Sequence, residues 1–295
     1  MDYSLLVENL PRSLVIGSAN FGSPYGAKKS WISTEEVNKI IQDATGRQNV
    51  FIETSESYLG AEAAIGEALK FRKYKNIVLK VSPSAYSSEA SFMQSVESSL
   101  LKMGQSSVYA IMLHGVGDSL GNSKTAIRTG IKNLLKSGMA EKVGLSCYSV
   151  SEVLASKVAF PEMSIFQLPE NIIDQRKKYS KDLSDLSESG VIFQVRSIFL
   201  QGLLIGNSDT DICQVSEFEK LRTEVETLAA VHNIDTTELC LRYALSIRWA
   251  SQFVLGLENF DQYSRNLQIL ESQGNDFLFD VSKGSDFIID PRNWS

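Results

Sequence analysis

The sequence has few of the residues that build disulfide frameworks and metal sites. Its 295 residues include three cysteines and two histidines. The cysteines lie far apart and form no C-x-x-C pair, which indicates reduced thiols in a cytoplasmic protein rather than a disulfide framework. His114 and His232 lack the short spacing of metal ligands, so we expect no metal site.

Long apolar runs and an excess of positive charge are also missing. No run of about 18 apolar residues occurs, so we expect no membrane span and no membrane partner. The N-terminal residues do not follow the basic-then-apolar pattern of a signal peptide. The formal net charge is −6, which argues against a nucleic-acid partner, because such proteins favour a basic surface. The sequence contains no feature that reveals oligomeric partners.

Eight short apolar runs are present, and they alternate with helical patterns. The runs comprise residues 14–17, 50–54, 77–81, 109–113, 142–146, 164–168, 191–196 and 253–257. The clearest helical patterns comprise residues 88–103, 126–135, 215–231, 236–247 and 260–270. Strand–helix alternation of this kind predicts a parallel sheet closed into a barrel. The alternative is an open doubly wound sheet, but no G-x-G-x-x-G follows the first run.

We therefore predict an α/β fold, a (β/α)₈ TIM barrel that forms a single domain over residues 1–295. The barrel core would extend from about residue 14 to 271, after a short N-terminal extension. Residues 272–295 would form an extended tail that lies over the barrel.

Polar or ionisable residues stand where several of the predicted strands end. Glu53, Lys80 and His114 occupy such positions, and Tyr58 follows Glu53 by five residues. In a parallel barrel the chemistry lies at the C-terminal ends of the strands, so these side chains should converge. A nearby ammonium lowers the pKa of a phenol, which is ordinarily about 10.

These residue types together suggest a way of protonating a carbonyl oxygen. Tyr58 would give the proton, Lys80 would tune the phenol, Glu53 would hold Lys80, and His114 would donate a hydrogen bond to the developing negative charge. A nicotinamide hydride is the natural partner of such a site. Trp31, on the loop after the first strand, is a candidate wall of the pocket for the small-molecule carbonyl substrate.

In their order and spacing, these residues resemble the aldo-keto reductase family. The family pattern D-T-A-x-x-Y-G corresponds to residues 53–59, and the family lysine and histidine fall on Lys80 and His114. The resemblance implies that Ser146 and Gln167 bind the nicotinamide amide. It also implies further cofactor contacts over the pyrophosphate and adenosine, at Arg196, Ser197, Phe199, Gly202, Gly256, Glu258, Gln262 and Asn266. Residues 167–176 and 196–202 resemble a bacterial subgroup associated with surface-sugar gene clusters, which implies a sugar-derived substrate.

The sequence departs from the family at three positions. Glu53 replaces an aspartate, so we expect an ion pair with Lys80 in altered geometry, and Glu53→Asp is expected to raise turnover. Leu59 replaces a glycine and would be strained at a positive φ, which would move Tyr58. Glu258 replaces an arginine that binds the 2′-phosphate of NADP, and a carboxylate favours NAD there. The family resemblance itself favours NADP.

We predict an NAD(P)-dependent oxidoreductase that reduces an aldehyde or ketone to an alcohol by hydride transfer, with Tyr58 as the proton donor. Two alternatives remain open. One is a catalytically weak dinucleotide-binding regulatory or sensor protein, which the changes at Glu53 and Leu59 suggest. The other is a lyase in which Lys80 forms a Schiff base.

Overall fold

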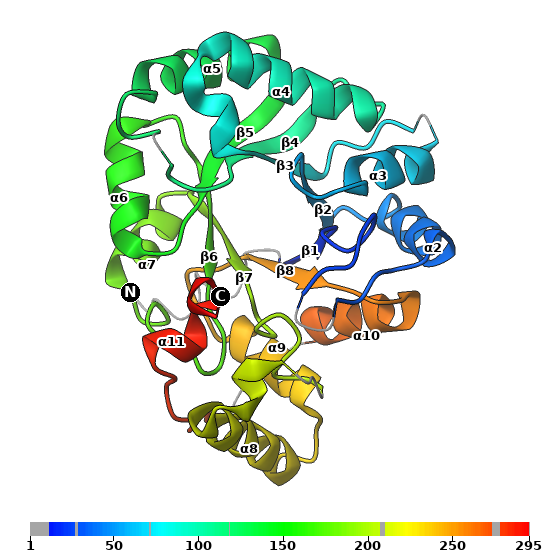
Figure 1. Cartoon of the computed structure of the whole chain (residues 1–295), viewed down its shortest axis with the longest axis vertical. Coiled ribbons are helices and arrows are strands. Elements are labelled where there is room, and N and C mark those ends of the chain that lie inside the picture. The colour runs from blue at the N-terminus through cyan, green and yellow to red at the C-terminus, as the bar shows by residue number, and fades with distance from the viewer. Residues whose placement is uncertain are drawn as a thin grey trace.

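The fold is a closed barrel of eight parallel strands in sequential order, from β1 to β8 and back to β1 (Figure 1). The structure is a computed structural model, and it describes residues 12–26, 29–70, 72–117, 119–206, 210–272 and 278–294. The strands are β1 (Ser13–Gly17), β2 (Val50–Ser55), β3 (Ile77–Val81), β4 (Val108–Leu113), β5 (Ala140–Ser146), β6 (Ile165–Pro169), β7 (Ile192–Arg196) and β8 (Gln252–Gly256). The predicted (β/α)₈ barrel is confirmed, and each predicted strand overlaps an observed one.

The strands are recognisable in the sequence because both of their faces are buried. All six residues of β2 and all five of β3 are shielded from solvent. One face of each strand packs inside the barrel and the other packs against the helices. Buried parallel strands therefore have nearly continuous apolar sequences, and the exceptions, such as Glu53 and Lys80, are conspicuous.

Helices surround the barrel (Figure 1). They are α2 (Thr34–Ala44), α3 (Ala61–Leu69), α4 (Glu89–Lys102), α5 (Lys124–Ser137), α6 (Val150–Ala159), α7 (Lys181–Glu188), α8 (Ser216–Val231), α9 (Thr236–Leu245), α10 (Phe260–Glu271) and α11 (Asp286–Ile289). Short 3₁₀ segments occur at η1 (Pro83–Ser87), η2 (Asp211–Gln214) and η3 (Pro291–Asn293). The five clearest helical patterns correspond to α4, α5, α8, α9 and α10.

The short helices α3 and α7 were not predicted from the sequence. Helix α3 begins after Gly60, whose φ of 79° is left-handed, and it has no side-chain cap. Helix α7 is eight residues long and has one buried residue, Leu183. Helix α3 buries Ala61, Ile65, Ala68 and Leu69 at helical spacing, but a helix this short repeats the pattern too few times to be identified in sequence. Tertiary packing decides the formation of such short helices.

The C-terminal segment differs from the predicted extended tail. It contains the helical turns α11 and η3, and it is fastened to α8 by hydrogen bonds. Ser282 and Ser285 donate backbone and side-chain hydrogen bonds to Glu224 and Glu217. The tail therefore has defined structure over residues 278–294. The predicted N-terminal extension lies outside the described residues up to position 11.

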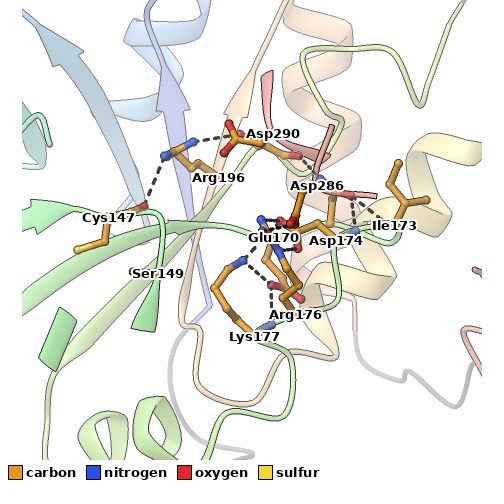
Figure 2. Close-up of polar contacts among 12 residues, drawn as sticks. Cys147, Ser149, Glu170, Ile173, Asp174, Arg176, Lys177, Arg196, Asp286 and Asp290 are labelled. Carbon is orange, nitrogen blue, oxygen red and sulfur yellow. Dashed lines mark hydrogen bonds and ion pairs between the residues drawn. The ribbon is translucent and has the colours of Figure 1, made fainter. Parts of the chain in front are cut away.

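A buried ion cluster joins the segment after β6 to this tail (Figure 2). Lys177 Nζ lies 3.4 Å from both Glu170 Oε2 and Asp174 Oδ2, and all three side chains are almost completely buried. Arg176 pairs with Asp174 at 2.7 Å and reaches Asp286 of α11 at 3.2 Å. These contacts fix the loop beside the C-terminal rim of the barrel.

Candidate active site

Three of the four predicted rim side chains form one compact group. Lys80 Nζ lies 2.6 Å from Glu53 Oε1, and the two side chains are 4% and 3% exposed. The same nitrogen donates a hydrogen bond of 2.7 Å to the Tyr58 hydroxyl, which lies 3.3 Å from Glu53 Oε1. The expected ion pair between Glu53 and Lys80 is therefore present, and the phenol contacts both of its members. We call Glu53, Tyr58 and Lys80 the rim group.

The loop that carries Tyr58 avoids the strain expected at Leu59. Leu59 has an ordinary φ and is 76% exposed, and the left-handed residue is the next one, Gly60, with a φ of 79°. A Cβ atom at Gly22 would lie 2.3 Å from the Leu59 carbonyl oxygen. A glycine at each of these positions lets the loops after β1 and β2 pack together, so Tyr58 reaches Lys80 without a strained leucine.

His114 lies beside this group at the end of β4. Its Nδ1 atom is 3.1 Å from the Ser55 hydroxyl and 3.2 Å from the Ser57 hydroxyl. The ring meets the Tyr58 ring edge-on, with centroids 5.8 Å apart. Burial, together with the positive charge of Lys80, lowers the pKa of His114 to about 4. The imidazole is therefore neutral at neutral pH and can donate a hydrogen bond without carrying a charge.

The electrostatics of Tyr58 differ from the sequence expectation. Burial and the nearby Glu53 carboxylate raise the pKa of Tyr58 well above its usual value. Burial also opposes ionisation of Glu53, but Lys80 and the hydrogen bonds outweigh it, so the pKa of Glu53 lies below its ordinary value. The group therefore holds a protonated phenol against an ionised carboxylate and an ammonium.

Ser146 and Gln167, which the resemblance assigns to the nicotinamide amide, are buried behind Glu53. Gln167 Nε2 donates a short hydrogen bond to Glu53 Oε2, and the Ser146 hydroxyl lies 3.4 Å from Gln167 Oε1. Gln167 is fully buried and Ser146 is 4% exposed. In this structure they support the wall of the site behind Glu53, and neither lines the cleft described next.

A cleft of about 370 Å³ opens in front of Glu53, Tyr58 and Lys80. Eight of the predicted cofactor residues line it: Arg196, Ser197, Phe199, Gly202, Gly256, Glu258, Gln262 and Asn266. They come from the loop after β7 and from the segment from the end of β8 into α10. The cleft thus joins the rim group to the residues that the resemblance assigned to a dinucleotide.

The cleft also contains residues that the sequence analysis missed. Tyr25 and Ser30 line it from the loop after β1, Thr237 from α9 and Arg265 from α10. The spacing of Arg265, three residues after Gln262 and so on the same side of α10, could have identified it. Thr237 could not have been found, because only the packing of α9 beside α10 brings it to the cleft.

Trp31 does not reach the cleft in this structure. Its side chain is 69% exposed, whereas Tyr25 on the same loop lines the cleft and lies 6.2 Å from the Tyr58 ring, centroid to centroid. Tyr25 and Ser30, which both line the cleft, pair as a β-bridge. Of the aromatic residues on this loop, the structure places Tyr25, and not Trp31, beside Tyr58.

The loop after β7 has an unusual backbone over the cleft. Ser197, Leu200 and Gln201 have φ values of 61°, 46° and 56°, which non-glycine residues rarely adopt. Arg196, just before them, donates a hydrogen bond to the Cys147 carbonyl at 3.5 Å (Figure 2) and lies over the Tyr148 ring at 4.5 Å. Strained backbone of this kind clusters at ligand-binding loops, where the surrounding structure holds it in place.

The chemistry of the cleft fits a nicotinamide dinucleotide. Added Cβ atoms at Gly202 and Gly256 would meet open space, so a ligand can approach the backbone there. Arg196, Arg265, Gln262 and Asn266 line the cleft and could supply donors for phosphate and ribose oxygens. Within the described parts of the chain, no group of three or more potential metal ligands converges. The same parts contain no helix that is both long and apolar enough to cross a bilayer.

The structure is thus an eight-stranded parallel barrel in which a tyrosine, a lysine and a carboxylate are in contact at the C-terminal rim. The model of the aldo/keto reductase family matches residues 13–276. The chain therefore belongs to the aldo/keto reductase family. Membership of this family supports the interpretation that the protein is an oxidoreductase that uses a nicotinamide dinucleotide. A comparison with curated protein sequences gave no match.

Solved structures of aldo-keto reductases have the same fold at low sequence identity. AKR11C1 from Bacillus halodurans, in its holo form, is 18% identical with a TM-score of 0.69, over 88% of this chain and 87% of that chain. The thermostable aldo-keto reductase Tm1743, in complex with the inhibitor epalrestat, is 18% identical with a TM-score of 0.67, over 89% and 91%. An aldo/keto reductase from Klebsiella pneumoniae, in complex with NADP and acetate, is 16% identical with a TM-score of 0.67, over 90% and 87%.

Proposed function

We propose that the protein reduces an aldehyde or ketone to an alcohol with a nicotinamide dinucleotide, and that Tyr58 donates the proton. The observation that carries this proposal is the contact of the Tyr58 hydroxyl with Lys80 Nζ at 2.7 Å, on the wall of a cleft that fits a dinucleotide. When bound, the dinucleotide would supply the hydride.

The three residues of the rim group and His114 have different roles in the proposed proton transfer. Burial and then Glu53 raise the pKa of Tyr58, which makes the phenol a weaker acid, so proton donation to a carbonyl oxygen depends on the Lys80 nitrogen 2.7 Å from its hydroxyl. The Lys80 ammonium stabilises the phenolate left behind, and Glu53 fixes the position of that ammonium. His114, neutral and held by two serine hydroxyls, would orient the carbonyl oxygen beside Tyr58.

Two features support a more specific proposal for the identity of the cofactor and of the substrate. Glu258 lines the cleft and would repel a 2′-phosphate, which favours NAD, whereas the NADP complex of the Klebsiella neighbour favours NADP. A sugar-derived carbonyl compound is proposed from the likeness of residues 167–176 and 196–202 to the bacterial subgroup. The cytoplasmic location and the single-domain organisation likewise remain predictions.

Titration with NADH and NADPH, followed by nicotinamide fluorescence, tests the binding step. Turnover on a panel of aldoses, ketoses and simple aldehydes tests the chemistry, with Tyr58→Phe as the matched variant. We expect Tyr58→Phe to bind the dinucleotide as the parent does and to lose about 10²- to 10⁴-fold in kcat, the usual contribution of a positioned acid. Equal turnover by both proteins would exclude Tyr58 as the proton donor.

The same experiments address the alternatives. Tight dinucleotide binding without turnover on any carbonyl would favour a regulatory or sensor protein. The ion pair of Lys80 with Glu53 disfavours a Schiff-base lyase, because an ammonium has no lone pair for attack on a carbonyl. Borohydride trapping of a substrate on Lys80 would reverse that conclusion.

A further inference from the structure

Three glutamines form a line through the interior of the barrel behind the rim group. Gln167, Gln194 and Gln252 lie on the neighbouring strands β6, β7 and β8, and at most 4% of each is exposed. Gln167 pairs in register with Gln194, and Gln194 pairs with Gln252. Successive residues of a barrel strand point alternately inward and outward, so residues in register on adjacent strands bring their side chains together.

The three side-chain amides form a directed chain of hydrogen bonds. Gln167 Nε2 donates to Glu53 Oε2 and, at 2.9 Å, to Gln194 Oε1. Gln194 Nε2 in turn donates to Gln252 Oε1 at 2.8 Å. Gln252 is the first residue of β8. The chain thus connects the ion pair at the rim to the N-terminal end of the barrel.

Two acceptors, the Glu53 carboxylate and Gln194 Oε1, set the orientation of the Gln167 amide. The Gln194 amide is oriented with its nitrogen toward Gln252, so it offers an oxygen to Gln167 and requires a donor there. A flipped Gln167 amide would place its own oxygen against both Gln194 Oε1 and the Glu53 carboxylate. Two buried acceptor–acceptor contacts are strongly unfavourable, so the amide nitrogen stays directed at Glu53.

The chain of hydrogen bonds ends on Glu53, at the position where the resemblance has an aspartate. Glu53 uses one carboxylate oxygen for Lys80 and Tyr58 and the other for Gln167. We propose that Gln194 and Gln252 are positioning residues of the active site, which hold the Gln167 amide so that it anchors Glu53, and through Glu53 the Lys80 ammonium. This inference rests on the proposed function for its catalytic consequence, but not for its structural one.

A different explanation is that the glutamines only satisfy one another inside the barrel. The two explanations differ in whether a change at Gln194 is transmitted to Gln167 and Glu53. The variant Gln194→Met keeps the length of the side chain and removes the acceptor. The variant Gln194→Glu keeps an oxygen that can accept from Gln167. Ile165→Val, on β6 and equally buried, is the matched control outside the chain.

Nuclear magnetic resonance of the side-chain amide protons tests the structural step. The Gln167 signals are identified by their loss in Gln167→Met. We expect two slowly exchanging protons in the parent and in Ile165→Val. In Gln194→Met, we expect solvent exchange of the Gln167 protons to be at least about tenfold faster, with partial recovery in Gln194→Glu. If Gln194→Met does not fold, Gln252→Met removes the next link and is expected to have a smaller effect of the same kind.

Steady-state kinetics test the catalytic step. We expect Gln194→Met to lower kcat about tenfold while the dissociation constant of the dinucleotide changes by less than about twofold, and Ile165→Val to change neither. Unchanged Gln167 exchange in Gln194→Met would overturn the proposal, and so would faster exchange with an unchanged kcat. If the parent reduces no carbonyl compound, the proposed function fails, and the exchange measurement still decides whether Gln194 orients Gln167.

Discussion

Glu53 shows how one added methylene changes the connections of an active site. Glu53 has one methylene more than an aspartate, and its carboxylate reaches both Lys80 on β3 and Gln167 on β6. The glutamate contacts both, and its two oxygens share three partners. In the sequence, a glutamate at position 53 suggested altered geometry of the ion pair. In the structure, the same side chain joins the ion pair to the barrel interior.

The structure changes the expected result of Glu53→Asp. The sequence alone predicted a gain in turnover, because aspartate is the family residue. With Gln167 positioned for a longer side chain, we expect Glu53→Asp to lower kcat on the order of 10-fold to 10²-fold, since small misplacements of this kind are costly. Steady-state kinetics on the best substrate of the carbonyl panel measure this, and a gain would show that the contact with Gln167 is dispensable.

Glu258 offers a second prediction for a single residue. Its carboxylate lines the cleft and accepts a hydrogen bond of 3.2 Å from Gln262 Nε2 at the entrance to α10. Glu258→Arg replaces a repulsive charge with a cation that can bind a phosphate in bidentate fashion. We expect the ratio of NADPH to NADH affinity to rise at least about tenfold, as measured by fluorescence titration. Glu258→Gln, which only removes the charge, should give an intermediate ratio.

The segment between β6 and α7 shows how an irregular element is held in place by buried charge. Glu170, Asp174 and Lys177 form an ion cluster, and Tyr243 of α9 donates a hydrogen bond to Glu170 at 3.0 Å. Burial raises the pKa of Glu170 to about 7, although Lys177 opposes the shift. Clusters of this kind fix a conformation more than they stabilise the fold.

This cluster predicts a pH dependence of stability. Because the pKa of Glu170 is raised to about 7 in the folded state from 4.5, the folded state binds its proton more tightly than the unfolded state. The contribution of Glu170 to the free energy of unfolding is complete below about pH 4.5 and is lost as the pH rises through 7. The free energy of unfolding therefore decreases by about 3 kcal/mol over this range. Urea unfolding between pH 4.5 and 8 would measure this decrease in the free energy of unfolding. In Glu170→Gln, the part of the decrease that comes from Glu170 should be absent.

At the scale of the whole molecule, the cleft joins parts of the chain that are distant in sequence. Its walls come from loops after β1, β2 and β7 and from α9 and α10. The C-terminal segment reaches the same region, because Arg292 lies 3.5 Å from the Tyr148 ring that Arg196 also contacts. A ligand in this cleft would therefore contact several of these segments at once.

A thermal prediction follows from this arrangement. A dinucleotide that binds only the folded protein stabilises it by about 2.7 kcal/mol at 100 times its dissociation constant. For a chain of this size we expect Tm to rise by several degrees, roughly 2–4 °C per kcal/mol. Differential scanning calorimetry with NADH and NADPH would measure the shift, and adenosine alone should give a smaller one. An unchanged Tm with either dinucleotide would contradict the proposed cofactor.

The barrel and most of the rim residues could be predicted from the sequence because both depend on local pattern. Buried parallel strands have short apolar sequences, and an ionisable residue at the end of such a strand is easily seen, as Glu53, Lys80 and His114 are. The cofactor positions at Gly256, Gln262 and Asn266 followed from motif spacing, and all three line the cleft.

Only the tertiary structure decided which side chains meet. Gln194 and Gln252 look like isolated polar residues in apolar strands, and the register of β6, β7 and β8 makes them a chain. Contacts between distant segments also decide three other features. These are the exposure of Trp31, the left-handed turn at Gly60 rather than at Leu59, and the folded tail. Hydrophobic period and motif spacing are local properties of the chain, whereas side-chain contacts across a closed barrel are determined by register and packing.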